Sequence, residues 1–119
     1  MPRVRDVMKT RLHTVGPGDT VGEAVAVMAQ NRVGSVLVME GERLLGIFTE
    51  RDTVRSLSLS YDAPRHDIVS WMTHDPKTVA PDTDTEEALH TMLDNGFRHL
   101  PVMEGGKVIG MVSMRDLAG

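Results

Sequence analysis

GIFTERD (residues 46–52) and GMVSMRD (residues 110–116) repeat one layout at two places in the chain. Each begins with a glycine and two apolar residues, continues with a hydroxyl side chain, and carries an aspartate three residues later. Aligning residues 8–52 with residues 72–116 without a gap gives 15 identities in 45 positions. Chance alone would give about three, so the chain contains an internal repeat.

Both copies predict the same order of elements. A short extended segment (HTV or KTV) and a proline turn lead into a helix that begins after Thr20 or Asp84. Each of these residues precedes a glutamate by three positions, which is the spacing of a capping box. Asn31 and Asn95 mark the helix ends, and two apolar strands follow, SVLVM and RLLGIF or LPVM and KVIGMV. A second helix is predicted after each aspartate.

These patterns predict an α/β (α+β) fold of two βαββα repeats. The strands are apolar almost throughout, so both faces of each sheet are expected to be covered. A unit of about 50 residues is marginal alone, so we expect the repeats to pack through their sheets around a pseudo-twofold axis. The expected boundaries are 1–57 for the first repeat with a solvated N-terminal arm, 58–70 for the connection, and 71–119 for the second repeat. The last helix is expected to be cut short at Gly119.

Composition excludes several classes of protein. The chain of 119 residues is 40% apolar and has no cysteine, which predicts a folded domain without disulfide or thiolate chemistry. Its net charge of −4 disfavours nonspecific nucleic-acid binding. No apolar run reaches membrane-spanning length and no signal peptide is evident, so a cytoplasmic protein without a membrane partner is expected. We find no metal-ligand spacing, P-loop or nucleophile elbow, and therefore predict no metal and no enzyme.

The two opening motifs can bind a sugar. Thr49 stands where a strand becomes a helix, and Asp52 follows one turn later, so a hydroxyl and a carboxylate lie together. A carboxylate accepts two hydrogen bonds at once and suits the vicinal hydroxyls of a ribose. Gly46 has no Cβ, which would let a flat ligand approach the backbone. The alternative is structural, because Thr-x-x-Asp is also the pattern of an ordinary capping box.

The layout glycine–apolar–apolar–Ser/Thr–x–x–Asp, together with FRHLPV and VIGMVSMRD, resembles the ribose motif of cystathionine-β-synthase (CBS) domains. The resemblance covers nearly the whole chain as a tandem pair, called a Bateman module, here free-standing. It implies a regulatory sensor of AMP, ADP or ATP, with S-adenosylmethionine and NAD ranked after them. It also implies a homodimer that acts on an unidentified regulated protein.

The resemblance also implies two nucleotide sites. The first would be lined by Thr14, Val15, Val33, Gly34, Ser35, Gly46, Thr49 and Asp52. The second would be lined by Thr78, Val79, Phe97, Arg98, His99, Gly110, Ser113 and Asp116. Arg51 and Arg115 could reach phosphates, or could be solvated helix residues. The competing hypothesis is a structural dimerisation or protein-interaction module in which the motif only caps helices.

Overall fold

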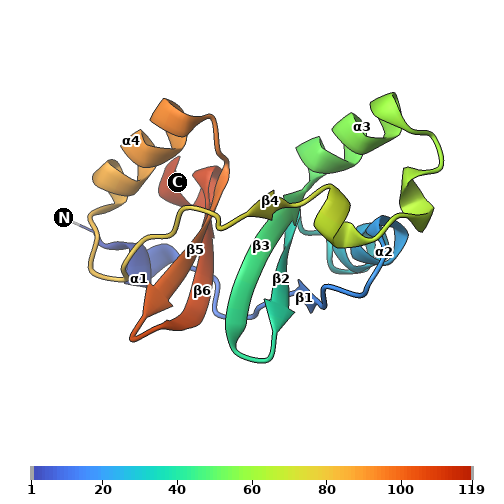
Figure 1. Ribbon diagram of the computed structural model, residues 1–119. Coiled ribbons are helices and arrows are strands. Elements are labelled where there is room, and N and C mark those ends of the chain that lie inside the picture. Colours follow the sequence, from blue (N-terminus) through green and yellow to red (C-terminus); the bar gives the residue numbers. More distant parts are fainter. Residues whose placement is uncertain (1, 119) are drawn as a thin grey trace. The chain divides into compact units, whose positions relative to one another are not determined.

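Residues 2–118 are described by a computed structural model, whose elements are labelled in Figure 1. The chain divides into two units. One is His13–Pro76, and the other joins Met1–Leu12 to Lys77–Gly119. We call them the first-repeat unit and the second-repeat unit. The division differs from the sequence repeats, because the N-terminal segment belongs with the second repeat.

The first-repeat unit is built on a four-stranded sheet in the order β1-β2-β3-β4. Its strands are β1 (Thr14–Val15), β2 (Ser35–Glu40), β3 (Arg43–Thr49) and β4 (Thr73–His74). Strand β1 runs parallel to β2, and the other two pairs are antiparallel. The helices are α2 (Val21–Asn31) and α3 (Glu50–Leu59), followed by the 3-10 turns η1 (Ala63–Arg65) and η2 (Ile68–Ser70). The predicted strands and helices are therefore present in this unit.

The second-repeat unit has the same order of elements, but its outer strands are reduced to single bridges. It contains α1 (Val4–Val7), α4 (Thr85–Asn95), β5 (His99–Glu104), β6 (Lys107–Ser113) and α5 (Met114–Ala118). Strands β5 and β6 form an antiparallel hairpin. Single bridges replace the outer strands: Val79 pairs with Val102, and Lys9 pairs with Met111. These pairs are the repeat equivalents of Val15–Val38 and Thr73–Ile47 in the first-repeat unit.

The helix starts agree with the sequence, but one cap does not. Thr20 caps α2, accepts a hydrogen bond from the Glu23 backbone N–H and forms the complete capping box. Asp84 is the N-cap residue of α4 but makes no side-chain capping bond. The predicted capping box is therefore wrong in the second copy. The Asp84 carboxylate instead lies 3.5 Å from the guanidinium of Arg3.

Each unit has its own apolar core. One core contains a residue of the expected N-terminal arm, and the other contains a residue of the expected connection 58–70. Val4 is fully buried with Leu100, Val102 and neighbouring residues of the second-repeat unit. Ile68 is fully buried in the first-repeat unit. The expectation of a solvated arm holds for its basic residues Arg3, Arg5, Lys9 and Arg11, which are exposed, but Val4 of the same segment supplies part of the second-repeat core. Arg5 remains half-exposed and hydrogen-bonds Asp82.

The segments that cross β3 and β6 leave no room for a side chain at Gly46 and Gly110. A Cβ on Gly46 would lie 2.6 Å from Met72 Sδ and 2.7 Å from the Thr73 carbonyl oxygen. A Cβ on Gly110 would lie 2.6 Å from Met8 Sδ and 3.0 Å from the Lys9 carbonyl oxygen. Each glycine therefore lets an edge segment pass close to the sheet, which accounts for it without a ligand.

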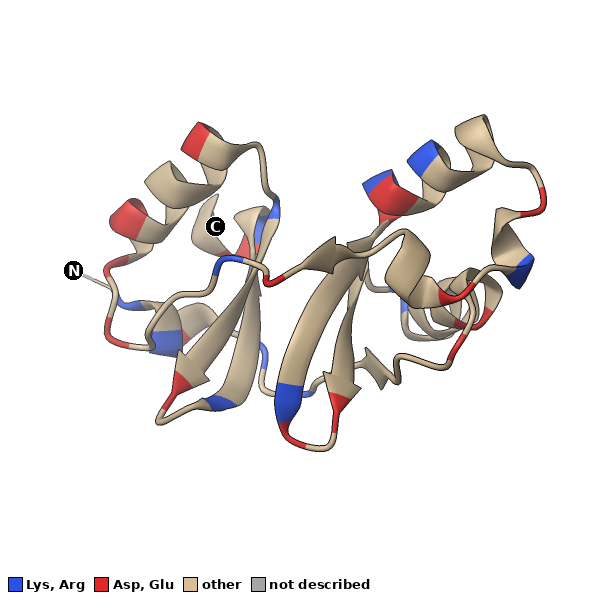
Figure 2. Ribbon diagram, viewed as in Figure 1, with Lys and Arg blue, Asp and Glu red and all other residues tan. Residues whose placement is uncertain are grey.

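Helix α3 carries both acidic and basic side chains, whereas α4 carries Asp and Glu but no Lys or Arg, as Figure 2 shows. Among residues 2–118, no helix has the length and apolar character needed to cross a membrane.

Candidate functional site

The two Ser/Thr–Asp pairs adopt nearly identical geometry at the junctions β3–α3 and β6–α5. The Thr49 N–H donates to Asp52 Oδ2 at 3.0 Å, and the Thr49 hydroxyl donates to the same oxygen at 3.1 Å. The corresponding distances from Ser113 to Asp116 Oδ2 are 2.9 and 3.0 Å. In both pairs the aspartate N–H donates back to the hydroxyl at 3.3 Å. Both pairs therefore form the reciprocal hydrogen bonds of a capping box.

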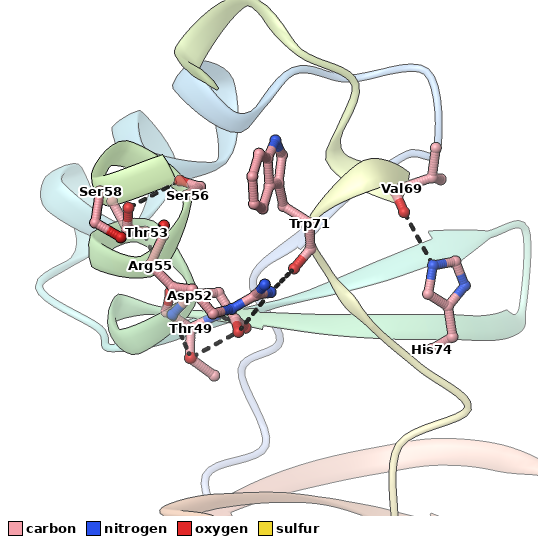
Figure 3. Close-up of polar contacts among 9 residues, drawn as sticks. All are labelled: Thr49, Asp52, Thr53, Arg55, Ser56, Ser58, Val69, Trp71 and His74. Atoms are coloured by element: carbon pink, nitrogen blue, oxygen red, sulfur yellow. Dashed lines mark hydrogen bonds and ion pairs between the residues drawn. The ribbon is translucent and has the colours of Figure 1, made fainter. Parts of the chain in front are cut away.

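Capping leaves one oxygen of each carboxylate for other partners. Both aspartate side chains are only 12% exposed, and in each the Oδ1 atom faces a cation. Arg55 Nη2 lies 3.7 Å from Asp52 Oδ1, as Figure 3 shows. Lys9 Nζ lies 3.7 Å from Asp116 Oδ1. Each carboxylate therefore has a fixed orientation, with Oδ2 in the capping box and Oδ1 beside a cation, and Oδ1 retains the capacity to accept a further hydrogen bond.

Backbone pairing brings further predicted residues to these junctions. Ser35 is the strand partner of Thr49, and the Gly34 carbonyl accepts from the Glu50 N–H at 3.1 Å. In the second repeat, His99 is the strand partner of Ser113. The Arg98 carbonyl there accepts from the Met114 N–H at 2.8 Å. The start of β2 and the end of β3 thus lie together in the first-repeat unit, as do the start of β5 and the end of β6 in the second-repeat unit.

The remaining predicted residues fall into three groups. Val15 is buried in the first-repeat core, and three others pack against a core while partly buried: Val33, Val79 and Phe97. Thr14 and Thr78 are exposed. Thr14 pairs with Leu37 of β2, and β2 in turn pairs with β3, the strand that ends at Thr49. Arg51 and Arg115 are exposed beside the aspartates. The contact of any of these residues, or of Gly46 and Gly110, with a ligand stays a prediction.

Two cations beside the aspartates were not predicted from the sequence. Arg55 follows Asp52 by three residues, so helical spacing could have found it. Lys9 reaches Asp116 from a distant part of the chain, and only the pairing of Lys9 with Met111 explains its position. Within residues 2–118, no group of three or more His, Asp or Glu side chains could hold a metal ion. The buried side-chain polar atoms of that range all have hydrogen-bond partners.

The class of protein follows from the repeated plan. Two α/β units, each with a capped Ser/Thr–Asp junction at the end of a covered sheet, define a tandem pair of homologous modules. The family model of the CBS domain matches residues 4–59 and again residues 66–119. The chain belongs to the CBS domain family.

Relatives and solved structures agree with this assignment. An uncharacterized 17.7 kDa protein of Acidianus ambivalens is 41% identical over 119 residues, covering 98% of this chain and 71% of the relative. The crystal structure of the CBS-domain containing protein ATU1752 from Agrobacterium tumefaciens has a TM-score of 0.94 at 29% identity. The match covers 98% of this chain and 97% of that one. The crystal structure of CBSX2 in complex with AMP has a TM-score of 0.84 at 26% identity, covering 98% and 93% of the two chains.

Proposed function

We propose that the chain is a regulatory module that binds an adenosine nucleotide of the AMP, ADP or ATP type at its Ser/Thr–Asp junctions. The observation that carries the proposal is the orientation of Asp52 and Asp116. Each holds one oxygen in a capping box and turns the other toward a cation. The similarity to CBSX2, a structure in complex with AMP, supports the choice of an adenosine ligand.

The proposed mechanism uses the residues already at the junction. A ribose diol donates to the Oδ1 atom of the aspartate, which can accept further hydrogen bonds while it faces Arg55 or Lys9. The cation stays at the junction and is available to a phosphate group of the same ligand. Binding shifts the conformation, or the arrangement of two chains, only to the extent that the nucleotide binds one state more tightly than the other.

Calorimetric titration with AMP, ADP, ATP, NAD and S-adenosylmethionine tests the proposal. We expect saturable heat with at least one adenine mononucleotide. Asp52→Asn and Asp116→Asn should each weaken binding at their own site about tenfold, because a charge-assisted hydrogen bond is lost. Asp94→Asn, an exposed aspartate on α4, is the matched control and should leave the affinity unchanged. No heat with any of the five ligands, or full affinity in the doubly substituted chain, would reject the proposal.

A second candidate function is homodimerisation without a nucleotide response. It is favoured by exposed apolar side chains on and just after α3, namely Val54, Leu57, Leu59 and Tyr61. It is also compatible with capping boxes that are complete without a ligand. Sedimentation velocity with and without AMP separates the candidates. A dimer that forms alike in both conditions, together with no heat of binding, favours this second function.

A further inference from the structure

Arg55 is held between the Asp52 carboxylate and Trp71, as Figure 3 shows. Its Nη2 donates to the Trp71 carbonyl oxygen at 3.0 Å and lies 3.7 Å from Asp52 Oδ1. The guanidinium carbon lies 5.5 Å from the centroid of the Trp71 ring, within the range of a cation–π contact. Three contacts thus fix the guanidinium, although its side chain is 49% exposed.

Trp71 is itself fixed by its neighbours. Its Nε1–H donates to His66 Nδ1 at 3.0 Å, and the two rings are stacked with centroids 6.1 Å apart. The other ring nitrogen of His66 lies 3.4 Å from Asp62 Oδ1. The hydrogen bond from Ser60 lowers the pKa of Asp62, which keeps that carboxylate charged near His66. Arg55 therefore contacts a tryptophan that is itself held in place by His66.

The position of Arg55 has an electrostatic consequence for any sugar held by Asp52. An uncompensated carboxylate repels a phosphate attached to the same ribose. Arg55 offsets that charge and carries several N–H donors in one plane, of which the described contacts use only the Nη2 group. An uncharged nucleoside gains nothing from this cation, whereas a nucleoside phosphate does.

We propose that Arg55 is a specificity-determining residue that makes the first-repeat site prefer a phosphorylated nucleoside to the free nucleoside. The inference rests on the proposed function. It is particular to this site, because extending the gapless alignment by one residue at its start and three at its end places Val7 opposite Trp71 and Gly119 opposite Arg55. At Asp116 the cation is Lys9, whose side chain is 73% exposed.

The test compares AMP with adenosine by calorimetry in a chain carrying Asp116→Asn, so that the first-repeat site is measured. We expect Arg55→Gln to raise the Kd for AMP about tenfold and the Kd for adenosine less than about twofold. Arg65→Gln removes a positive charge from an exposed position of the same unit and should leave the ratio of the two Kd values unchanged. Arg55→Lys keeps the charge without the planar fork and should give an intermediate ratio.

The ratio of Kd values separates selection from a structural effect, because loss of helix packing would weaken both ligands alike. A ratio unchanged in Arg55→Gln, or in Arg55→Lys if the first variant fails to fold, overturns the inference while leaving nucleotide binding in place. If the Asp116→Asn parent binds neither AMP nor adenosine while the unsubstituted chain binds AMP, the first-repeat site is not a nucleotide site and the inference fails alone. If the unsubstituted chain also binds no adenine nucleotide, the proposed function fails as well.

Discussion

Gly46→Ala is expected to lower the free energy of unfolding by about 3 kcal/mol, near the upper end for overpacking of a close contact. The new Cβ would lie 2.7 Å from the Thr73 carbonyl oxygen, which is part of the backbone and cannot rotate away. The Met72 sulfur, at 2.6 Å, is the end of a flexible side chain and can move more easily. Gly110→Ala should cost less, about 1 kcal/mol, because its backbone contact with Lys9 is longer, at 3.0 Å.

Urea denaturation followed by circular dichroism measures this difference. Gly18→Ala is the matched control, because nothing lies within 4 Å of the Cβ it would add, and it should change stability little. If Gly46→Ala is as stable as Gly18→Ala, then Met72 and Thr73 do not cross β3 as described.

Val4→Ala is expected to destabilise the protein by about 2 kcal/mol, because two buried methyl groups are lost and a cavity is left. Val4 is 0% exposed and packs with the core of the second-repeat unit. The same urea experiment checks this value, with Thr10→Ala, an exposed position of the same segment, as the control. A solvated arm would predict equal and negligible effects of the two substitutions, and that result would contradict the assignment of the N-terminal segment to this core.

Local signals in the sequence predicted most of the fold. The strands SVLVM, RLLGIF, LPVM and KVIGMV, the helix starts at Thr20 and Asp84 and the helix ends at Asn31 and Asn95 agree with the structure. The extended segment KTV forms only a single bridge, at Val79. These features depend on residues close together in the chain: apolar periodicity, caps and turn glycines. The gapless repeat carried each feature from one copy to the other, and even the irregular pairing after Val38 recurs after Val102.

The features that sequence reasoning missed depend on distant pairing. Nothing near Val4 indicates that its partners lie about a hundred residues away in the chain. Asp84 has the residue type and spacing of a capping residue. The Asp84 side chain nevertheless makes no capping hydrogen bond and lies beside Arg3 instead. The crossing of Gly46 by Met72 and Thr73 was not predicted, because these residues come from another part of the sequence; contact of Gly46 with a ligand stays a prediction.

The hydroxyl and carboxylate residues of the candidate site could be predicted from the sequence, but the contacts of the cations that face the carboxylates could not. The Thr49–Asp52 and Ser113–Asp116 pairs follow from spacing alone, since the two residues of each pair are one helical turn apart. Helical spacing places Arg55 near Asp52 but does not predict its contacts with Trp71, and Lys9 arrives from the distant N-terminal segment. The two junctions are therefore similar in backbone but different in the charge that faces the aspartate.

Nuclear magnetic resonance with ¹⁵N-labelled protein tests nucleotide binding at the capped junctions most directly. The Thr49 and Ser113 amides donate to the aspartates that are proposed to hold the ribose, so their signals report on those carboxylates. On titration with AMP, ADP or ATP, we expect saturable shifts of these amides that disappear when both aspartates are changed to asparagine. Saturable shifts confined to other residues, or no shift with any of the three nucleotides, would contradict nucleotide binding at these junctions.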